Sequence, residues 1–203
     1  MQKPYPAELY AKLHLGNPGD LDFYRGQCRG VGAILELGCG YGRVLETLAG
    51  EDRSLVGLDL NRGLLELAAK RLGTRRRVAL VLGDMRCFAF RRKFDRILVP
   101  YSGLYCLLSG DEVTACFQCV ADHLAPEGRL IFDAYSADAF HRELPSPEGA
   151  DRDVDAIANI VQDGTAYQVV EQANWSRDEQ RLAVAYPSAP LPRARHTTPP
   201  PPT

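Results

Sequence analysis

Two hydrophobic patterns alternate along the chain between residues 31 and 136. Short apolar runs predict five strands buried on both faces, with the sequences VGAILELG, SLVGLDL, RVALVLGD, FDRILVPY and RLIFDAY. Between them, apolar residues recur every three or four positions and predict helices, with the sequences GRVLETLAG, RGLLELAAKRL and EVTACFQCVADHL. This order predicts an α/β fold with a doubly wound, mostly parallel sheet and helices on both faces.

The ends of these helices carry recognisable signals. Asn61 precedes the second helix, and Ser109 or Asp111 precedes the third, at positions where a side-chain oxygen can accept from free backbone amides. Gly50 and Gly73 follow the first and second helices, where a glycine often ends a helix.

The alternation stops after residue 136. The runs GTAYQVVEQANW and RLAVAYP, separated by the polar SRDEQ, predict an antiparallel hairpin. Seven of the 14 prolines lie from residue 187 onward, so we expect a disordered tail. The sequence thus predicts four regions, which are a helical segment over 1–30, an α/β core over 31–136, a hairpin or lid over 137–187 and a proline-rich tail over 188–203.

Charge and hydropathy exclude some classes of partner. The formal net charge of the 203 residues is -2, which argues against bulk binding to nucleic acid or to an anionic membrane. The basic runs at 75–77 and 91–93 are short, and we interpret them as solvated loops rather than as a phosphate-binding patch. No stretch reaches the roughly 18 apolar residues of a membrane span, and MQKPYPAELY has no apolar signal region. We therefore expect a cytoplasmic protein without nucleic-acid or membrane partners.

The six cysteines do not indicate a disulfide framework, because the chain is long enough to have a substantial core. Cys116 and Cys119 form one C-x-x-C, but it falls inside a predicted helix and no second pair has zinc-site spacing. We expect reduced thiols and no metal site.

Three glycines follow the first predicted strand in ILELGCGYGRV. Gly38, Gly40 and Gly42 weaken a strand and a helix alike, so this position requires bare backbone. In an open parallel sheet it lies at the carboxyl edge, where ligands bind. Arg43 stands where the dinucleotide-binding G-x-G-x-x-G pattern has its third glycine, which argues against a pyrophosphate loop.

Acidic residues end the next two predicted strands. Asp59 lies where a carboxylate can accept from two ribose hydroxyls, a feature common to nicotinamide and adenosyl cofactors. Asp84 can accept from an adenine amine or cap the following turn, and its position does not decide between them. Met85 offers apolar area to a ring face.

In order and spacing, LELGCGYGR, GLDL, GDM and LAPEGRLIFD resemble the class I S-adenosylmethionine-dependent methyltransferases, which have a Rossmann-like fold. The resemblance runs from about residue 20 to residue 136, and HLGNPGDLDFY is similar to the entry segment of the small-molecule branch. It implies S-adenosyl-L-methionine as cofactor. It also implies transfer of a methyl group to an oxygen or nitrogen of a small-molecule acceptor.

The resemblance implies a role for each residue of the motifs. Glu36 would steady the glycine loop through its backbone amides, and Asp59 would hold the ribose. Tyr24 and Arg43 would place the amino-acid end of the cofactor. The full set of implied cofactor-binding residues is Tyr24, Glu36, Gly38, Cys39, Gly40, Arg43, Asp59, Leu60, Gly83, Asp84, Met85 and Pro100.

Residues on the acceptor side should follow the fourth and fifth strands. In PYSGLYCL the catalytic candidates are Tyr101 and Tyr105, with Ser102 beside them. Related proteins often carry a histidine near this loop, where this chain has Cys106. Further candidates after the fifth strand are Asp133, Tyr135 and His141. Packing explains Tyr101 and Tyr135 equally well, and we interpret His14 and His141 as surface residues.

The resemblance also implies a helix and an antiparallel strand pair after the fifth strand, completing a seven-stranded sheet. Residues 165–186 are either that pair or a substrate-covering insertion, and their pattern favours the insertion. The hypothesis is then a methyltransferase with a shortened C-terminus, active as a monomer or homodimer. The alternatives are a protein that binds S-adenosylmethionine without turnover and, less favoured because of Arg43, a nicotinamide-dependent oxidoreductase.

Overall fold

The computed structural model describes residues 6–50, 52–75, 77–136, 156–162, 165–176 and 178–191. The chain divides into two compact units, Met1–Ala137 and Asp138–Thr203. The first unit contains the glycine-rich loop and the candidate site.

The first unit is built on a parallel sheet. Its strands are β1 (Ala33–Leu37), β2 (Ser54–Asp59), β3 (Val78–Leu82), β4 (Phe94–Val99) and β5 (Leu124–Phe132). Their order is β3-β2-β1-β4-β5, and every neighbouring pair is parallel. The order reverses between β1 and β4, so the carboxyl ends of these two strands flank the position where ligands bind in such sheets. The predicted α/β fold is confirmed.

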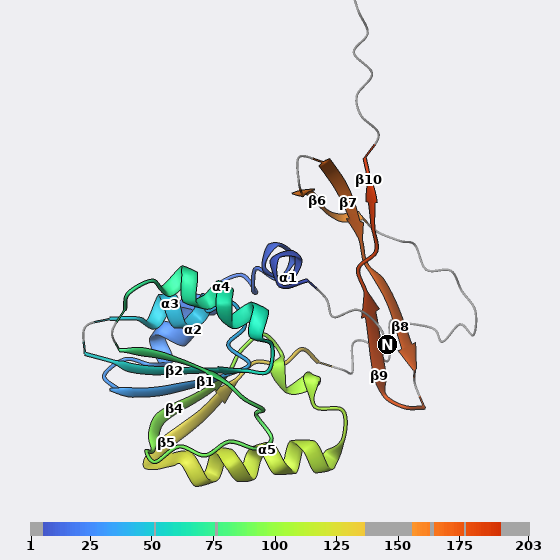
Figure 1. The fold of residues 1–203 in the computed structure, drawn as a ribbon. Helices are drawn as coiled ribbons and strands as arrows, with labels where there is room; N and C mark the ends of the chain where they lie inside the picture. Colours follow the sequence, from blue (N-terminus) through green and yellow to red (C-terminus); the bar gives the residue numbers. More distant parts are fainter. Residues whose placement is uncertain are drawn as a thin grey trace, which may run out of the picture. The chain divides into compact units, whose positions relative to one another are not determined.

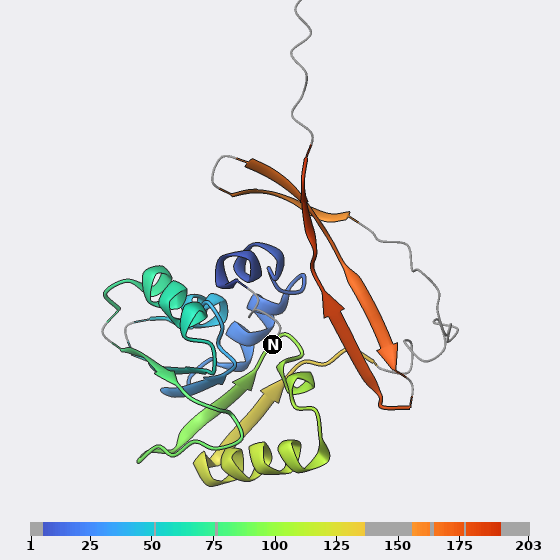
Figure 2. The ribbon, with the colours of Figure 1, turned by 45° about the vertical axis from the view of Figure 1, so that its right-hand side comes forward.

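Helices cover both faces of this sheet (Figure 1). They are α1 (Ala7–Leu13), α2 (Asp20–Gln27), α3 (Arg43–Leu48), α4 (Arg62–Leu72), the short 3-10 helix η1 (Gly103–Cys106) and α5 (Gly110–His123). Helix α5 lies on one face, and α2, α3 and α4 lie on the other (Figure 2). Within the described residues, every helix is too short or too polar to cross a membrane.

Helix capping follows the sequence signals closely. The side chain of Asn61 accepts a hydrogen bond from the Leu64 amide at 3.2 Å, as predicted. For α5 the cap is Ser109 rather than Asp111, since the Ser109 hydroxyl accepts from the Glu112 amide at 3.2 Å. Helix α3 ends at Leu48, ahead of Gly50.

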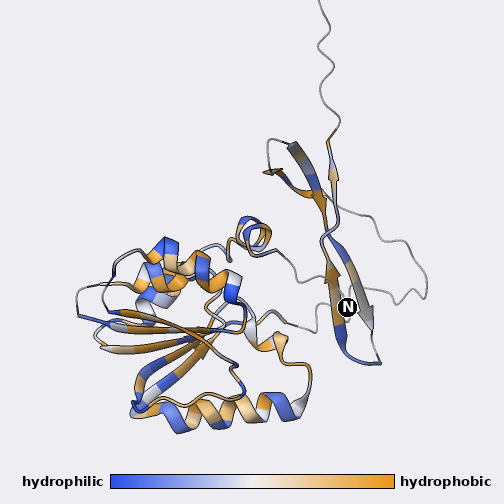
Figure 3. Ribbon diagram, in the orientation of Figure 1, coloured by the Kyte–Doolittle hydropathy of each residue, from blue (hydrophilic) through white to orange (hydrophobic). Residues whose placement is uncertain are grey.

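The core is sorted by the alternation of side chains along each strand. In β1, Ile34 packs in the layer of α2, α3 and α4, while Leu35 and Leu37 pack in the layer of α5. All three are fully buried, so each contributes about 2 kcal/mol of transfer free energy. The sheet is correspondingly apolar along its strands (Figure 3). Burial on both faces explains why the strand sequences are nearly continuous apolar runs.

Basic and acidic side chains satisfy backbone groups at the amino edge of the sheet. Asp95 Oδ2 accepts from the amides of Gly32 and Ala33, at 3.0 and 2.8 Å. Arg75 donates to the carbonyl of Leu72 at 2.9 Å, and Lys93 donates to that of Asp122. These carbonyls lie at the C-terminal ends of α4 and α5, where a cation is favourable. The described residues of the basic runs, 75, 77 and 91–93, are exposed as predicted, and one residue of each run caps a helix.

Strand β5 begins earlier than its sequence indicates. The apolar run RLIFDAY predicted a strand from Arg129, but β5 already starts at Leu124, which pairs with Phe94. The pairing shifts register between Phe94 and Arg96. A bulge of this kind lets a strand contain a Pro-Glu-Gly sequence that would otherwise end it.

The second unit contains two antiparallel sheets. Its strands are β6 (Ala156–Gln162), β7 (Thr165–Val170), β8 (Gln172–Ser176), β9 (Arg181–Ala185) and β10 (Ser188–Pro190). Strands β8 and β9 form the predicted hairpin. Strand β7 belongs to a separate sheet, of order β10-β7-β6, and β6 was not predicted.

The predicted disordered tail is wrong at its start. Residues 188–190 form β10, paired with β7. The Leu191 amide donates to the Ala166 carbonyl at 2.8 Å and extends this pairing. Strand β10 is an edge strand, where a proline costs no ladder hydrogen bond if its nitrogen faces outward. Residues 192–203 of the predicted tail lie outside the described residues.

Candidate cofactor site

The glycine-rich loop leaves β1 in a conformation that few other residues adopt. Gly38, Gly40 and Gly42 have φ of 66, 52 and 79°. A Cβ on Gly42 would lie 3.1 Å from Ala68 Cβ, so this glycine lets α3 approach α4. Cβ atoms on Gly38 and Gly40 would come no nearer than 3.5 Å to the next side chain. A Cβ would therefore fit at the first two glycines, whereas the third glycine allows close packing.

Asp59 connects the glycine loop to β2. Its Oδ2 accepts from the Gly40 amide and its Oδ1 from the Asn61 amide, both at 2.7 Å. The residue is 9% exposed, and burial raises the pKa of its carboxyl group. The Leu60 amide also acts on this carboxylate, which has about four acceptor positions, so the carboxylate retains capacity to accept from a ligand.

Glu36 of β1 has a carboxyl group that is buried in the sheet. It is 2% exposed, and burial raises the pKa of its carboxyl group to about 8, although nearby Arg43 acts in the opposite direction. Its backbone hydrogen bond involves Leu45 of α3 rather than an amide between Gly38 and Gly42. Among the described residues its Oε2 has no hydrogen-bond partner, and such an atom is costly unless a ligand or water satisfies it.

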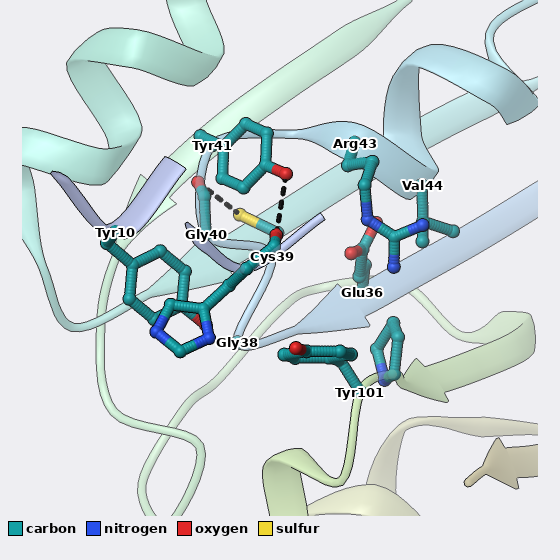
Figure 4. A pocket seen from close by; sticks show the side chains of 11 residues that line it. Tyr10, Glu36, Gly38, Cys39, Gly40, Tyr41, Arg43, Val44 and Tyr101 are labelled. Carbon is teal, nitrogen blue, oxygen red and sulfur yellow. Dashed lines mark hydrogen bonds between the residues drawn. The ribbon is translucent and has the colours of Figure 1, made fainter. Parts of the chain in front are cut away.

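Two cavities meet at this edge of the sheet. The larger has a volume of about 390 Å³, within the usual range for small-molecule sites. The predicted residues that line it are Gly38, Gly40, Asp59, Leu60, Gly83, Asp84, Met85, Pro100 and Tyr101. The smaller has a volume of about 40 Å³, and the predicted residues that line it are Glu36, Gly38, Cys39, Gly40, Arg43, Pro100 and Tyr101 (Figure 4). Sequence motifs spread over 66 positions thus converge on one edge.

Asp84 lines the larger cavity and also caps a turn. Its Oδ1 accepts from the Arg86 amide at 2.8 Å, and both carboxylate oxygens accept from the Arg86 side chain. Arg86 lowers the pKa of the Asp84 carboxyl group and itself donates to Glu112. The turn-capping interpretation is therefore correct, and the side chain still borders the cavity.

Two predicted site residues line neither of these cavities. Tyr24 is fully buried, and its hydroxyl donates to Asp133. Tyr105 donates to the Tyr135 carbonyl at 2.7 Å, and the two rings are 4.6 Å apart. Asp133 and Tyr135 are likewise absent from the lining. His141 lies outside the described residues.

Two aromatic residues of the N-terminal segment line the cavities, although the sequence analysis missed Tyr10 and interpreted His14 as a surface residue. Tyr10 lines both cavities, and His14 lines the smaller one with its ring 4.2 Å from that of Tyr10. The Tyr41 hydroxyl donates to the His14 carbonyl at 2.8 Å. Burial raises the pKa of Tyr10 to about 12 and lowers that of His14. The sequence offered one signal, since residues four apart on a helix lie on the same face.

An ion pair fixes the N-terminal segment to the glycine loop. Arg43 donates to both carboxylate oxygens of Asp20, at 2.8 and 2.6 Å, and both side chains are largely buried. Gly16 leaves room for this side chain, because a Cβ there would lie 2.2 Å from Arg43 Cζ. The arginine that breaks the dinucleotide fingerprint thus positions the segment that carries Tyr10 and His14.

The chain is similar to known methyltransferases. Residues 34–128 match the family model described as methyltransferase domain.

Two relatives and one solved structure extend the comparison beyond these residues. The chain is 30% identical over 125 residues to the putative methyltransferase YqeM of Bacillus subtilis, a match that covers 61% of this chain and 51% of that protein. It is 27% identical to a Streptomyces venezuelae dTDP-3-amino-3,4,6-trideoxy-alpha-D-glucopyranose N,N-dimethyltransferase, over 89% of this chain and 76% of the relative. The fold is similar to that of S-adenosylmethionine-bound CalS10, an amino pentose methyltransferase of Micromonospora echinaspora, with a TM-score of 0.61, 22% identity and coverage of 93% and 83%.

Proposed function

We propose that the protein is an S-adenosyl-L-methionine-dependent methyltransferase that transfers a methyl group to a nitrogen or oxygen of a small molecule. The observation that carries the proposal is the pairing of the two cavities at the glycine loop. One cavity has the size and polarity of an adenosine site, and the other presents the unpartnered oxygen of Glu36. The match of residues 34–128 to the methyltransferase domain model supports the same proposal.

The larger cavity suits the adenosine part of the cofactor. The Asp59 carboxylate lines this cavity and retains capacity to accept from a ribose hydroxyl. Leu60 is 70% exposed and lines this cavity with Met85, so an adenine ring between them would cover apolar area now open to water. Asp84 is held ionised by Arg86 and would accept from the adenine amine.

The smaller cavity suits the charged end of the methionine part. An ammonium group there would give Glu36 Oε2 the donor that it lacks and would stabilise the ionised carboxylate. Arg43 lines the same cavity and complements a carboxylate. Glu36 and Arg43 thus carry the charges that complement the ammonium and the carboxylate of the methionine part.

The chemistry comes mainly from the cofactor, which when bound supplies a methyl group activated by positive sulfur. The residues of this chain bind and orient the cofactor and the acceptor, and they exclude water. Tyr101 and Tyr10 line both cavities, so they would surround the region between the two parts of the cofactor. His14 lines the smaller cavity, and because burial lowers the pKa of its imidazole the ring stays neutral near pH 7.

An amine on a nucleotide-activated sugar is the acceptor class that we favour. This rests on the Streptomyces venezuelae relative, whose name describes N,N-dimethylation of a dTDP-aminosugar and which matches most of this chain. Tyr105 and Tyr135 form an exposed ring pair that would suit the acceptor side rather than the cofactor.

A methyl-transfer assay tests the proposal. The purified chain is incubated with S-adenosylmethionine and a set of dTDP-aminosugars, amines and alcohols, and release of S-adenosylhomocysteine is measured. We expect release that depends on an amine acceptor and is lost in Asp59→Ala. Cofactor binding with no turnover for any acceptor would instead favour a binding protein, and binding of NAD alone would favour an oxidoreductase.

A further inference from the structure

Two consecutive residues after β4 have a backbone conformation that is unfavourable for their side chains. Tyr101 and Ser102 both have φ of 55°, and neither is a glycine. Among the described residues, the other non-glycine position with positive φ is Gln180, in the β8–β9 turn. A left-handed conformation costs roughly 1–2 kcal/mol for each such residue, so the surrounding structure must enforce this pair.

The enforcing group is a carboxylate at the end of the neighbouring strand. Asp133 follows β5, and its Oδ1 accepts from the Tyr101 amide at 2.7 Å while its Oδ2 accepts from the Ser102 amide at 3.0 Å. The buried hydroxyl of Tyr24 donates to the same Oδ1. One carboxylate thus binds both amides of the unfavourable pair, and Tyr24 of α2 donates a further hydrogen bond to this carboxylate.

The hydrogen bonds of Asp133 determine where the ring of Tyr101 lies. Tyr101 lines both cavities, and its ring centroid is 6.0 Å from that of His14. Figure 4 shows the Tyr101 side chain among the residues that enclose the smaller cavity. An extended or right-handed backbone at 101 and 102 would direct this ring elsewhere, because φ sets the direction of the Cα–Cβ bond.

We propose that Asp133 is a positioning residue, which holds Tyr101 over the site through the amides of the left-handed pair Tyr101–Ser102. The inference deepens the proposed function and rests on it for the identity of the ligand that Tyr101 meets. Asp133 itself lines neither cavity, so it acts through the turn.

The matched control is a second carboxylate with the same chemistry. Asp95 also accepts from two consecutive backbone amides, those of Gly32 and Ala33, but at the amino edge of the sheet. Asp133→Asn leaves one backbone amide facing an NH₂ group, because each of its two oxygens accepts from one amide. Asp95 binds both of its amides through Oδ2, so Asp95→Asn keeps an oxygen for them and loses only the charge of the acceptor. Both variants should therefore lose thermal stability, and only Asp133→Asn should change the site.

The test combines calorimetric titration with S-adenosylhomocysteine and amide hydrogen exchange of residues 100–106. We expect Asp133→Asn to lower the affinity by about tenfold and to speed exchange at Tyr101 and Ser102, whereas Asp95→Asn retains wild-type affinity. The double variant Asp133→Asn/Ser102→Gly should recover part of the affinity, since glycine adopts the left-handed conformation without strain. A merely stabilising role for Asp133 would not produce this recovery.

Each result decides for or against the proposal. Equal loss of affinity in Asp133→Asn and Asp95→Asn, or no recovery in the double variant, would overturn the positioning role. Unchanged exchange at Tyr101 and Ser102 in Asp133→Asn would also overturn it. If the wild-type chain binds no S-adenosylhomocysteine, the proposed function fails, while the exchange measurement still tests whether Asp133 holds the turn.

Discussion

Charged residues have different roles at the two edges of the parallel sheet. At the amino edge, Asp95, Arg75 and Lys93 are directed at backbone groups of the protein itself. At the carboxyl edge, Asp59 retains spare lone pairs and Glu36 Oε2 has no partner in the described part of the chain. The amino edge is satisfied by the protein alone. The carboxyl edge has unsatisfied capacity that a ligand would fill, which is why function belongs there.

The largest effect that would separate the two edges is expected at Asp59. We predict that Asp59→Ala weakens binding of S-adenosylhomocysteine at least about a hundredfold, because two charge-assisted hydrogen bonds to the ribose are lost. Isothermal titration calorimetry measures this. Asp95→Ala is the matched control at the opposite edge and should retain wild-type affinity while losing stability. Equal affinities for the two variants would contradict the assignment of the ribose site.

The next effect is a pH dependence of stability that originates at Glu36. Its folded pKa of about 8 exceeds the unfolded value of 4.5, so between these values the folded state holds a proton that the unfolded state has released. The free energy of unfolding therefore falls as pH rises through this window, by about 3 kcal/mol between pH 5 and pH 8.

Urea denaturation of the wild type and Glu36→Gln across this pH range measures the effect of Glu36 directly. The neutral glutamine removes the titration, so the stability difference between the two proteins should change with pH in favour of the variant at pH 8. A difference that is constant from pH 5 to pH 8 would show that Glu36 is not protonated in the folded state.

A smaller effect should distinguish Gly40 from Gly42 within the glycine loop. Alanine at Gly40 or Gly42 is strained by a left-handed φ, so each variant should lose about 1–2 kcal/mol of stability. Gly42→Ala also brings Cβ to 3.1 Å from Ala68, whereas the Cβ of Gly40→Ala would enter the cavity. We predict that Gly40→Ala loses more affinity for S-adenosylhomocysteine and that Gly42→Ala loses more stability. The reverse order would contradict the assignment of the two glycines.

The smallest effect is expected at the amino edge. Arg75→Ala removes the donor to the carbonyls at the end of α4, so it should lower the free energy of unfolding by about 0.5 kcal/mol. Affinity for S-adenosylhomocysteine should not change. Thermal denaturation and calorimetry together test this, and an altered affinity would show that the two edges are not independent.

The sequence predicted the parts of the molecule that depend on local patterns. The five buried strands and the cap at Asn61 follow from apolar runs and from an asparagine before a helix, and the structure contains them. The glycine loop was also predictable, since alternate glycines have few other uses. These features involve residues close together in the chain.

The contacts that sequence reasoning missed join distant residues. Asp133 binds Tyr24 from 109 positions away, and Tyr101 from 32. Arg43 was interpreted as a ligand-placing residue, but its ion pair with Asp20 shows that it also fixes the N-terminal segment. Strand β6 was missed because its sequence, AIANIVQ, alternates weakly between apolar and polar residues. Such pairings depend on the tertiary fold and leave no local pattern.

Parallel calorimetric titrations of the wild-type chain with S-adenosylhomocysteine and with NAD test the central claim most directly. The account predicts one site with a dissociation constant in the micromolar range for S-adenosylhomocysteine and no binding of NAD. Binding of NAD without S-adenosylhomocysteine would contradict it, because the carboxyl edge would then hold a dinucleotide despite Arg43.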